Sequence, residues 1–74
     1  MKHELKVRST VIDWLEKKLE ITDTAGVKHI VSLDKPITVT MVGYPDRETK
    51  TMPAHDLGDY MTSGYIIERI SYEE

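Results

Sequence analysis

Apolar and polar residues follow two different spacings along this chain, and each spacing predicts a different element. Residues 37–42 alternate between an apolar side chain and a threonine or valine, which is the two-residue period of a strand with one buried face. The same alternation marks residues 18–22 and 27–33, which flank a short loop that ends in Gly26. We therefore expect a β-hairpin followed by a further strand.

The spacing changes in the last third of the chain, where a short helix is expected. Ala54, Leu57 and Met61 recur at helical intervals and form one apolar stripe. Pro53 precedes them at a position where a helix tolerates proline, and Gly64 follows where a helix commonly ends. The next residues are β-branched and aromatic, as in a buried strand: Tyr65, Ile66, Ile67 and Ile70.

Two further segments complete the expected sheet. Residues 48–52 are polar and include Lys50, which suits a strand at an exposed sheet edge. Residues 9–20 fit a helix and a strand equally by spacing, and the Val, Ile, Thr and Trp at 10–14 favour the strand. We predict one α+β domain over residues 1–74, with a mostly antiparallel sheet of four or five strands and one short helix near the C-terminus.

Composition limits what this single domain can be. Its 74 residues are 39% hydrophobic and 31% charged and include no cysteine, which is typical of a small globular domain in a reducing compartment. No apolar run approaches the roughly 20 residues that span a bilayer. The opening Met-Lys-His-Glu-Leu-Lys also lacks the apolar core of a signal peptide. We therefore expect a cytoplasmic protein that does not act in a membrane.

Charge is distributed unevenly and bears on the choice of partner. Residues 1–35 carry seven Lys/Arg and six Asp/Glu, a net charge of +1, whereas residues 36–74 carry three and seven, a net charge of −4. An acidic surface disfavours a phosphate backbone, and carboxylates interrupt the basic residues of the first third. We therefore expect the partner to be a protein with a basic surface rather than a nucleic acid.

The sequence carries no catalytic or cofactor signature. It contains no phosphate-binding glycine loop, no dinucleotide fingerprint and no nucleophile motif. His55 and Asp59 are four residues apart on the expected helix, but a structural zinc site needs four ligands and no thiolate exists to complete it. We expect no enzymatic activity, no cofactor and no metal.

The aromatic residues indicate contact with a protein. The chain has one Trp, four Tyr and no Phe, and Trp and Tyr are enriched at the energetic centres of interfaces. We expect Trp14 in the core, because a small domain usually buries its only tryptophan. Tyr44 on a Gly-Tyr-Pro turn and Tyr60 at the margin of the helical stripe are better placed as anchors. The predicted contact residues are Tyr44, His55, Asp56, Asp59 and Tyr60.

These patterns favour a small non-enzymatic protein-binding module. We expect an accessory or inhibitory factor, of the kind found in bacteria and their phages, that covers a surface of a larger protein. A β-rich nucleic-acid-associated module is the alternative, and it would bind with a steep salt dependence. A homo-oligomeric structural subunit is the third hypothesis. A homodimer is also compatible with the sequence, because a core this small is only marginally stable alone.

Overall fold

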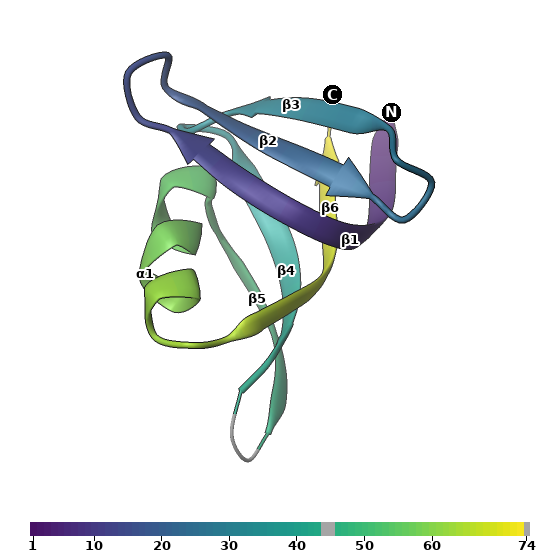
Figure 1. Ribbon diagram of the computed structural model, residues 1–74, viewed down its shortest axis with the longest axis vertical. Coiled ribbons are helices and arrows are strands. Elements are labelled where there is room, and N and C mark those ends of the chain that lie inside the picture. Colours follow the sequence, from purple (N-terminus) through teal and green to yellow (C-terminus); the bar gives the residue numbers. More distant parts are fainter. Residues whose placement is uncertain (44–45, 74) are drawn as a thin grey trace.

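The computed structural model describes residues 1–43 and 46–73 and consists of a six-stranded antiparallel sheet with one short helix near the C-terminus (Figure 1). Its elements are β1 (Lys2–Asp13), β2 (Lys18–Asp23), β3 (Lys28–Ser32), β4 (Pro36–Val42), β5 (Arg47–Pro53), the 3₁₀ helix η1 (Ala54–Asp56), α1 (Leu57–Thr62) and β6 (Ile66–Glu73). The strands follow the order β3-β2-β1-β6-β4-β5 across the sheet. The expected antiparallel sheet and helix are confirmed, but the count of four or five strands is wrong.

The additional strand arises from the segment whose spacing fitted both helix and strand. The structure forms the end of β1 and the start of β2 there, joined by a turn at residues 14–17. A shift in the register between Val7 and Ser9 breaks the alternation of β1. Leu5 and Val7 face the core before the shift, and Thr10, Ile12 and the terminal Asp13 are partly buried after it. One continuous strand therefore has an irregular sequence pattern.

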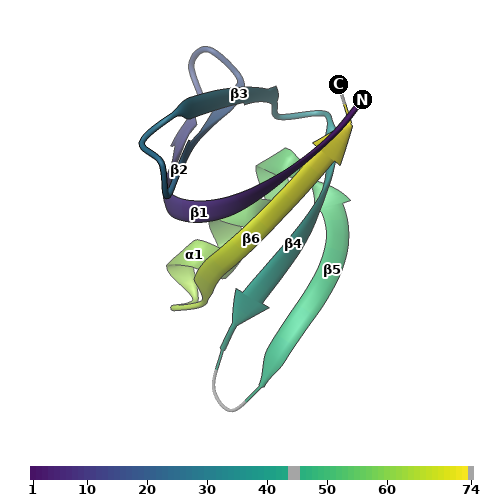
Figure 2. The same ribbon diagram turned by 90° about the vertical axis from the view of Figure 1, so that its right-hand side faces the viewer.

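β1 belongs to both halves of the sheet. Its residues 2–6 pair with β6, and its residues 7–13 pair with β2. Figure 2 shows β1 curving from the side of β6 toward β2 and β3, so that the sheet bends around the core. The fully buried side chains come from both halves and from the helical segment; the largest are Leu19, Ile21, Ile37, Met41, Leu57, Ile70, Val31 and Val39.

The helical segment is anchored at its start by the sheet. Pro53 ends β5 in an extended conformation, and the next two amides donate hydrogen bonds to the connection between β3 and β4. Ala54 N–H bonds the carbonyl of Lys35 at 2.9 Å, and His55 N–H bonds that of Leu33 at 3.0 Å. The predicted helix over 54–62 thus begins as a 3₁₀ turn, and its apolar stripe faces the core as expected.

The helix ends where the sequence predicted. Gly64 has a φ of +91°, in the left-handed region that glycine adopts at little cost. β6 then follows, but it is buried only in its second half: Ile70 and Tyr72 lie in the core, while Ile66 is 69% exposed. No helix in the described part of the chain is long and apolar enough to cross a membrane.

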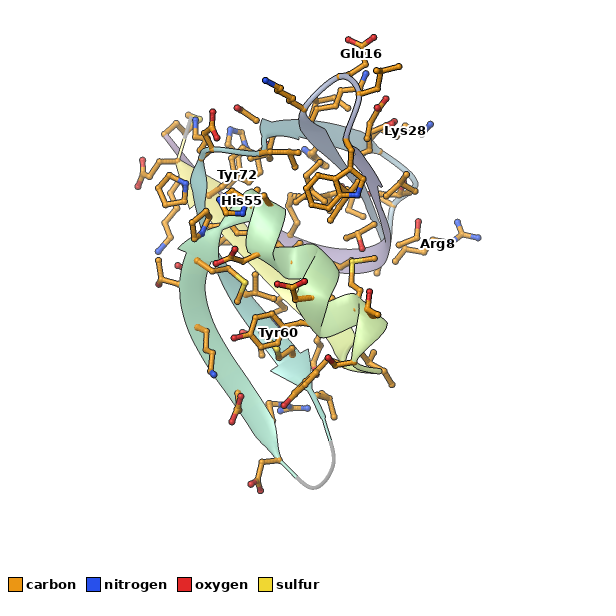
Figure 3. All side chains as sticks on the ribbon, turned by 90° about the vertical axis from the view of Figure 1, so that its left-hand side faces the viewer. Arg8, Glu16, Lys28, His55, Tyr60 and Tyr72 are labelled. Carbon is orange, nitrogen blue, oxygen red and sulfur yellow. The ribbon has the colours of Figure 1, made fainter. Side chains whose placement is uncertain are left out.

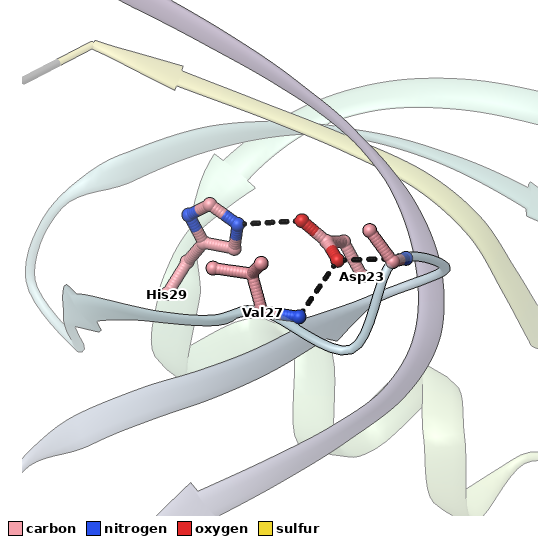
Figure 4. Close-up of polar contacts among 4 residues, drawn as sticks. Asp23, Val27 and His29 are labelled. Atoms are coloured by element: carbon pink, nitrogen blue, oxygen red, sulfur yellow. Dashed lines mark hydrogen bonds and ion pairs between the residues drawn. The ribbon is translucent and has the colours of Figure 1, made fainter.

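Asp23 organises the β2–β3 turn, as Figure 4 shows. Its Oδ1 accepts hydrogen bonds from the amides of Ala25 and Val27, both at 2.9 Å. Its Oδ2 lies 2.9 Å from His29 Nε2. His29 and the amide of Val27 hold the pKa of the Asp23 carboxyl below its usual range. The predicted hairpin is thus fixed by one carboxylate that reaches both of its strands.

Candidate protein-binding surface

The predicted acidic contact residues lie together on the helical segment. Because Ala54 and Leu57 turn inward and are fully buried, His55 and Asp59 are left exposed and Asp56 half-buried. His55 Nδ1 lies 2.9 Å from Asp56 Oδ1. Figure 3 shows His55 at the start of this segment. Two carboxylates in so short a segment can accept charge-assisted hydrogen bonds from Lys or Arg of a partner.

Tyr60 makes several contacts within its own chain, which leaves less of its side chain for a partner. Its ring meets Tyr65 edge to face, with centroids 5.5 Å apart and planes at 77°. Lys50 Nζ lies 5.5 Å from the centre of the same ring. Tyr60 and then Glu48 raise the pKa of the Lys50 ammonium group. Tyr60 is half-buried (Figure 3), so only part of it remains for a partner.

The other predicted aromatic anchor, Tyr44, lies outside the described residues. Its role as a contact residue stays a prediction. The described strands on either side of it, β4 and β5, pair at their ends through Val42 and Arg47.

The expectation that Trp14 lies in the core is wrong, because its side chain is 61% exposed. β1 ends at Asp13, whose Oδ1 accepts a hydrogen bond from the amide of Glu16 at 3.0 Å and so fixes the turn. Lys17 completes this turn with a φ of 56°. Trp14 and its neighbour Leu15, which is 90% exposed, are therefore presented at the end of the β1–β2 hairpin.

The indole of Trp14 is supported from below by the helix. A Cβ atom placed on Gly58 would lie 3.3 Å from Trp14 Cζ2 and 3.1 Å from Ile12 Cδ1, so the ring packs closely over the glycine. Glycine inside a helix costs about 0.5–1 kcal/mol relative to alanine. Gly58 within a predicted helix was thus the signal in the sequence that another group approaches the backbone there.

Trp14, Leu15, His55, Asp56 and Asp59 form what we term the Trp14 surface. Its apolar centre comes from the hairpin turn and its acidic margin from the helical segment. Glu16, labelled at the tip of the hairpin in Figure 3, adds a further carboxylate beside Leu15. Within residues 1–43 and 46–73, no group of three or more His, Asp or Glu side chains is arranged to hold a metal ion.

Comparisons with known proteins identify no relative of this chain. No family model matches it, and neither a curated protein nor a solved structure does. Function is therefore inferred from the molecule's own surfaces.

Proposed function

We propose that this protein is a non-enzymatic protein-binding module that docks on a larger protein through the Trp14 surface. The observation that carries the proposal is the exposure of Trp14, 61%, on a ring that is held in place by Gly58. A rigid, exposed tryptophan buries a large area at small entropic cost when a partner covers it, which is why tryptophan dominates interface energetics.

The acidic margin favours a partner with a basic surface around an apolar socket. Asp56 and Asp59 contribute two carboxylates to the helical segment, and the last turn of α1 carries no basic residue. Opposite charges around an apolar centre mainly raise the rate of encounter and select the partner, while the buried aromatic ring sets the rate of dissociation. Such a module acts as an accessory or inhibitory factor by covering part of its partner.

We retain the cytoplasm as the proposed location, on the cysteine-free composition alone. We likewise propose no enzymatic activity, because the Trp14 surface projects from the molecule and combines an exposed indole with solvated carboxylates. Catalytic carboxylates are typically desolvated within a pocket.

The test begins with cross-linking in a lysate of the source organism to identify the partner, followed by binding kinetics with purified proteins. Trp14→Ala is expected to speed dissociation about tenfold or more, because an interface tryptophan commonly contributes over 1 kcal/mol. Ile66→Ala is the matched control, since Ile66 is equally exposed, at 69%, but belongs to β6. It should bind as the wild type does.

Reversing the charges of Asp56 and Asp59 to lysine tests the acidic margin separately. Association should slow, and more at low salt than at high salt, because salt screens exposed charges. If Trp14→Ala and this double variant both bind as the wild type does, the Trp14 surface is not the contact surface.

A further inference from the structure

A second surface, on the other side of the molecule, has the opposite charge. The strands β1, β6, β4 and β5 present an outer face that lies away from α1 and toward the viewer in Figure 2. A hollow of about 430 Å³ opens in this face. Among the residues that the structure describes, its charged lining consists of three cations and one carboxylate, Lys2, Lys6, Arg69 and Glu4. The hollow is therefore net positive in a protein whose net charge is −3.

The central feature of the hollow is a pair of like charges. Lys6 of β1 stands directly opposite Arg69 of β6 in the register of the two strands. Side chains opposite each other in an antiparallel pair have Cβ atoms about 4.5–5.5 Å apart, and like charges at that distance destabilise the sheet. Among the described residues, no carboxylate lies within ion-pair distance of either cation. The protein thus keeps two like charges opposite each other without a direct ion pair to either, although Glu4 lines the same hollow.

The carboxylate directly before Arg69 in the chain forms an ion pair with a different cation. Glu68 Oε2 lies 3.1 Å from a guanidinium nitrogen of Arg47 on β5. A register shift between β4 and β6 makes this possible: Thr40 pairs with Arg69 and Met41 with Ile67, so Glu68 is the additional residue. β-Bulges commonly redirect side chains beside functional sites. Here the bulge leaves Arg69 in the hollow and Glu68 with another partner.

Hydroxyl groups continue the row of cations across the sheet. Thr40 of β4 stands opposite Arg69, and Thr49 of β5 stands opposite Thr40. The two threonine hydroxyls are 3.2 Å apart, and all of these residues line the hollow. One row therefore offers an ammonium group, a guanidinium group and two hydroxyl groups, which together can donate hydrogen bonds to an anion.

We propose that this hollow binds an oxyanion group, phosphate or carboxylate, of a small molecule. The guanidinium of Arg69 can hold two of its oxygens, Lys6 supplies a second positive charge, and the hydroxyl of Thr40 donates a further hydrogen bond. A bound anion would be attracted by both Lys6 and Arg69 and would offset the repulsion between them. None of the described residues that line the hollow is aromatic, so they offer no platform for the base stacking that single-stranded nucleic acids require.

The direct test is a titration of the ¹⁵N-labelled protein, followed by NMR, with inorganic phosphate in one arm and citrate in the other. Chloride keeps the ionic strength constant, because general screening also shifts resonances. Saturable shifts centred on Lys6, Thr40 and Arg69 support the proposal, and the arm with the tighter binding identifies phosphate or carboxylate as the group. Shifts that are linear and scattered over the surface in both arms overturn it.

Three glutamine variants separate this site from general charge effects. Lys6→Gln and Arg69→Gln should each weaken binding by about tenfold or more, the loss expected for a charge-assisted hydrogen bond. Lys28→Gln is the control and should bind normally, since Lys28 is an exposed strand lysine on β3 that lies 3.8 Å from Glu20.

Lys6→Gln and Arg69→Gln should also be more stable than the wild type when no anion is present. Removing either cation relieves the repulsion across β1 and β6, so the Tm of the free protein should rise. Phosphate or citrate, whichever binds, should raise the Tm of the wild type and not that of Arg69→Gln. A lower Tm for both variants, or unchanged binding by Arg69→Gln, contradicts the proposal.

Discussion

Asp23 shows how much one side chain contributes when it lies in a turn. Both carboxylate oxygens are used, one by two backbone amides and one by His29. These partners stabilise the ionised form, which is why the pKa of Asp23 is lowered. The contribution of the group to stability is therefore present above the ordinary pKa of an aspartate, near 4, and is lost as the pH falls through the lowered pKa.

We expect Asp23→Asn to reveal this dependence. The variant should have a lower Tm than the wild type at pH 6, because the charged contact with His29 is lost while the amide oxygen can still accept hydrogen bonds. The difference in Tm should begin to shrink as the pH falls below about 4, where the carboxyl of the unfolded chain takes up a proton, and should vanish below the lowered pKa of the folded protein. Thermal melts between pH 2 and pH 7 measure it. Asp34→Asn, at an exposed position, is the control, and a difference that stays constant with pH would contradict the prediction.

Single residues also mark the limit of what the sequence could predict of the candidate site. That His55, Asp56 and Asp59 lie close together was predictable, because residues at this spacing in one short helical segment are neighbours. The position of Trp14 depends on a turn whose geometry includes a positive φ at Lys17, and on the close packing of its ring over Gly58, where a side chain would be in the way. Neither condition follows from the average tendency of tryptophan to be buried, and so that tendency gave the wrong position.

The element that carries the acidic margin is a short helical segment. It spans one 3₁₀ turn and six residues of α-helix, which is too short to be stable by itself. Its stability comes from packing: Ala54 and Leu57 are fully buried, and the hydroxyl of Thr10 on β1 lies 3.2 Å from the sulfur of Met61. Removal of its buried side chains should therefore loosen the Trp14 surface as well.

Leu57→Ala should lower the free energy of unfolding by about 2–4 kcal/mol, because it leaves a cavity in a fully buried position. Thr62→Ala, at an exposed position of the same helix, should change it by less than about 0.5–1 kcal/mol. Chemical denaturation of both variants provides the comparison. Equal and small losses would show that the helix does not depend on its buried stripe.

At this scale the elements were predictable where the period of the sequence was regular. Ile37, Val39 and Met41 alternate without interruption, and all three are buried as expected. β1 was ambiguous because its register shift moves the buried positions from odd to even numbers, and no local pattern predicts where a long strand changes partners. The number of strands was therefore underestimated.

The whole molecule presents two faces of different character. The Trp14 surface is apolar with an acidic margin, and its residue His55 is labelled in Figure 3. The hollow with Lys6 and Arg69 lies on the sheet face shown in Figure 2, viewed from the opposite direction. The net charge of the whole chain, −3, does not reveal this separation. The two proposed sites are therefore separate, so a partner on the Trp14 surface would not compete with an anion in the hollow.

We expect the free protein to be a monomer at micromolar concentration. The two edge strands of the sheet are β3, which has five residues, and β5, where Lys50 and Glu48 are charged, and both features oppose pairing between sheet edges. Sedimentation velocity over a range of concentrations measures the mass. A dimer that also shifts the fluorescence of Trp14 to shorter wavelength would show that the Trp14 surface binds a second copy of the chain.

The division of β1 between two partners has a consequence for the order in which the chain folds during its synthesis. The β1–β2–β3 meander is local and can form early, whereas residues 2–6 wait for residues 69–73 of β6. Until β6 leaves the ribosome, Leu5 lacks its neighbour Ile70, and Lys6 does not yet face Arg69. The nascent chain would therefore acquire its hairpin early and the proposed anion site only with β6, so that affinity for an anion would report the pairing of β6 with β1.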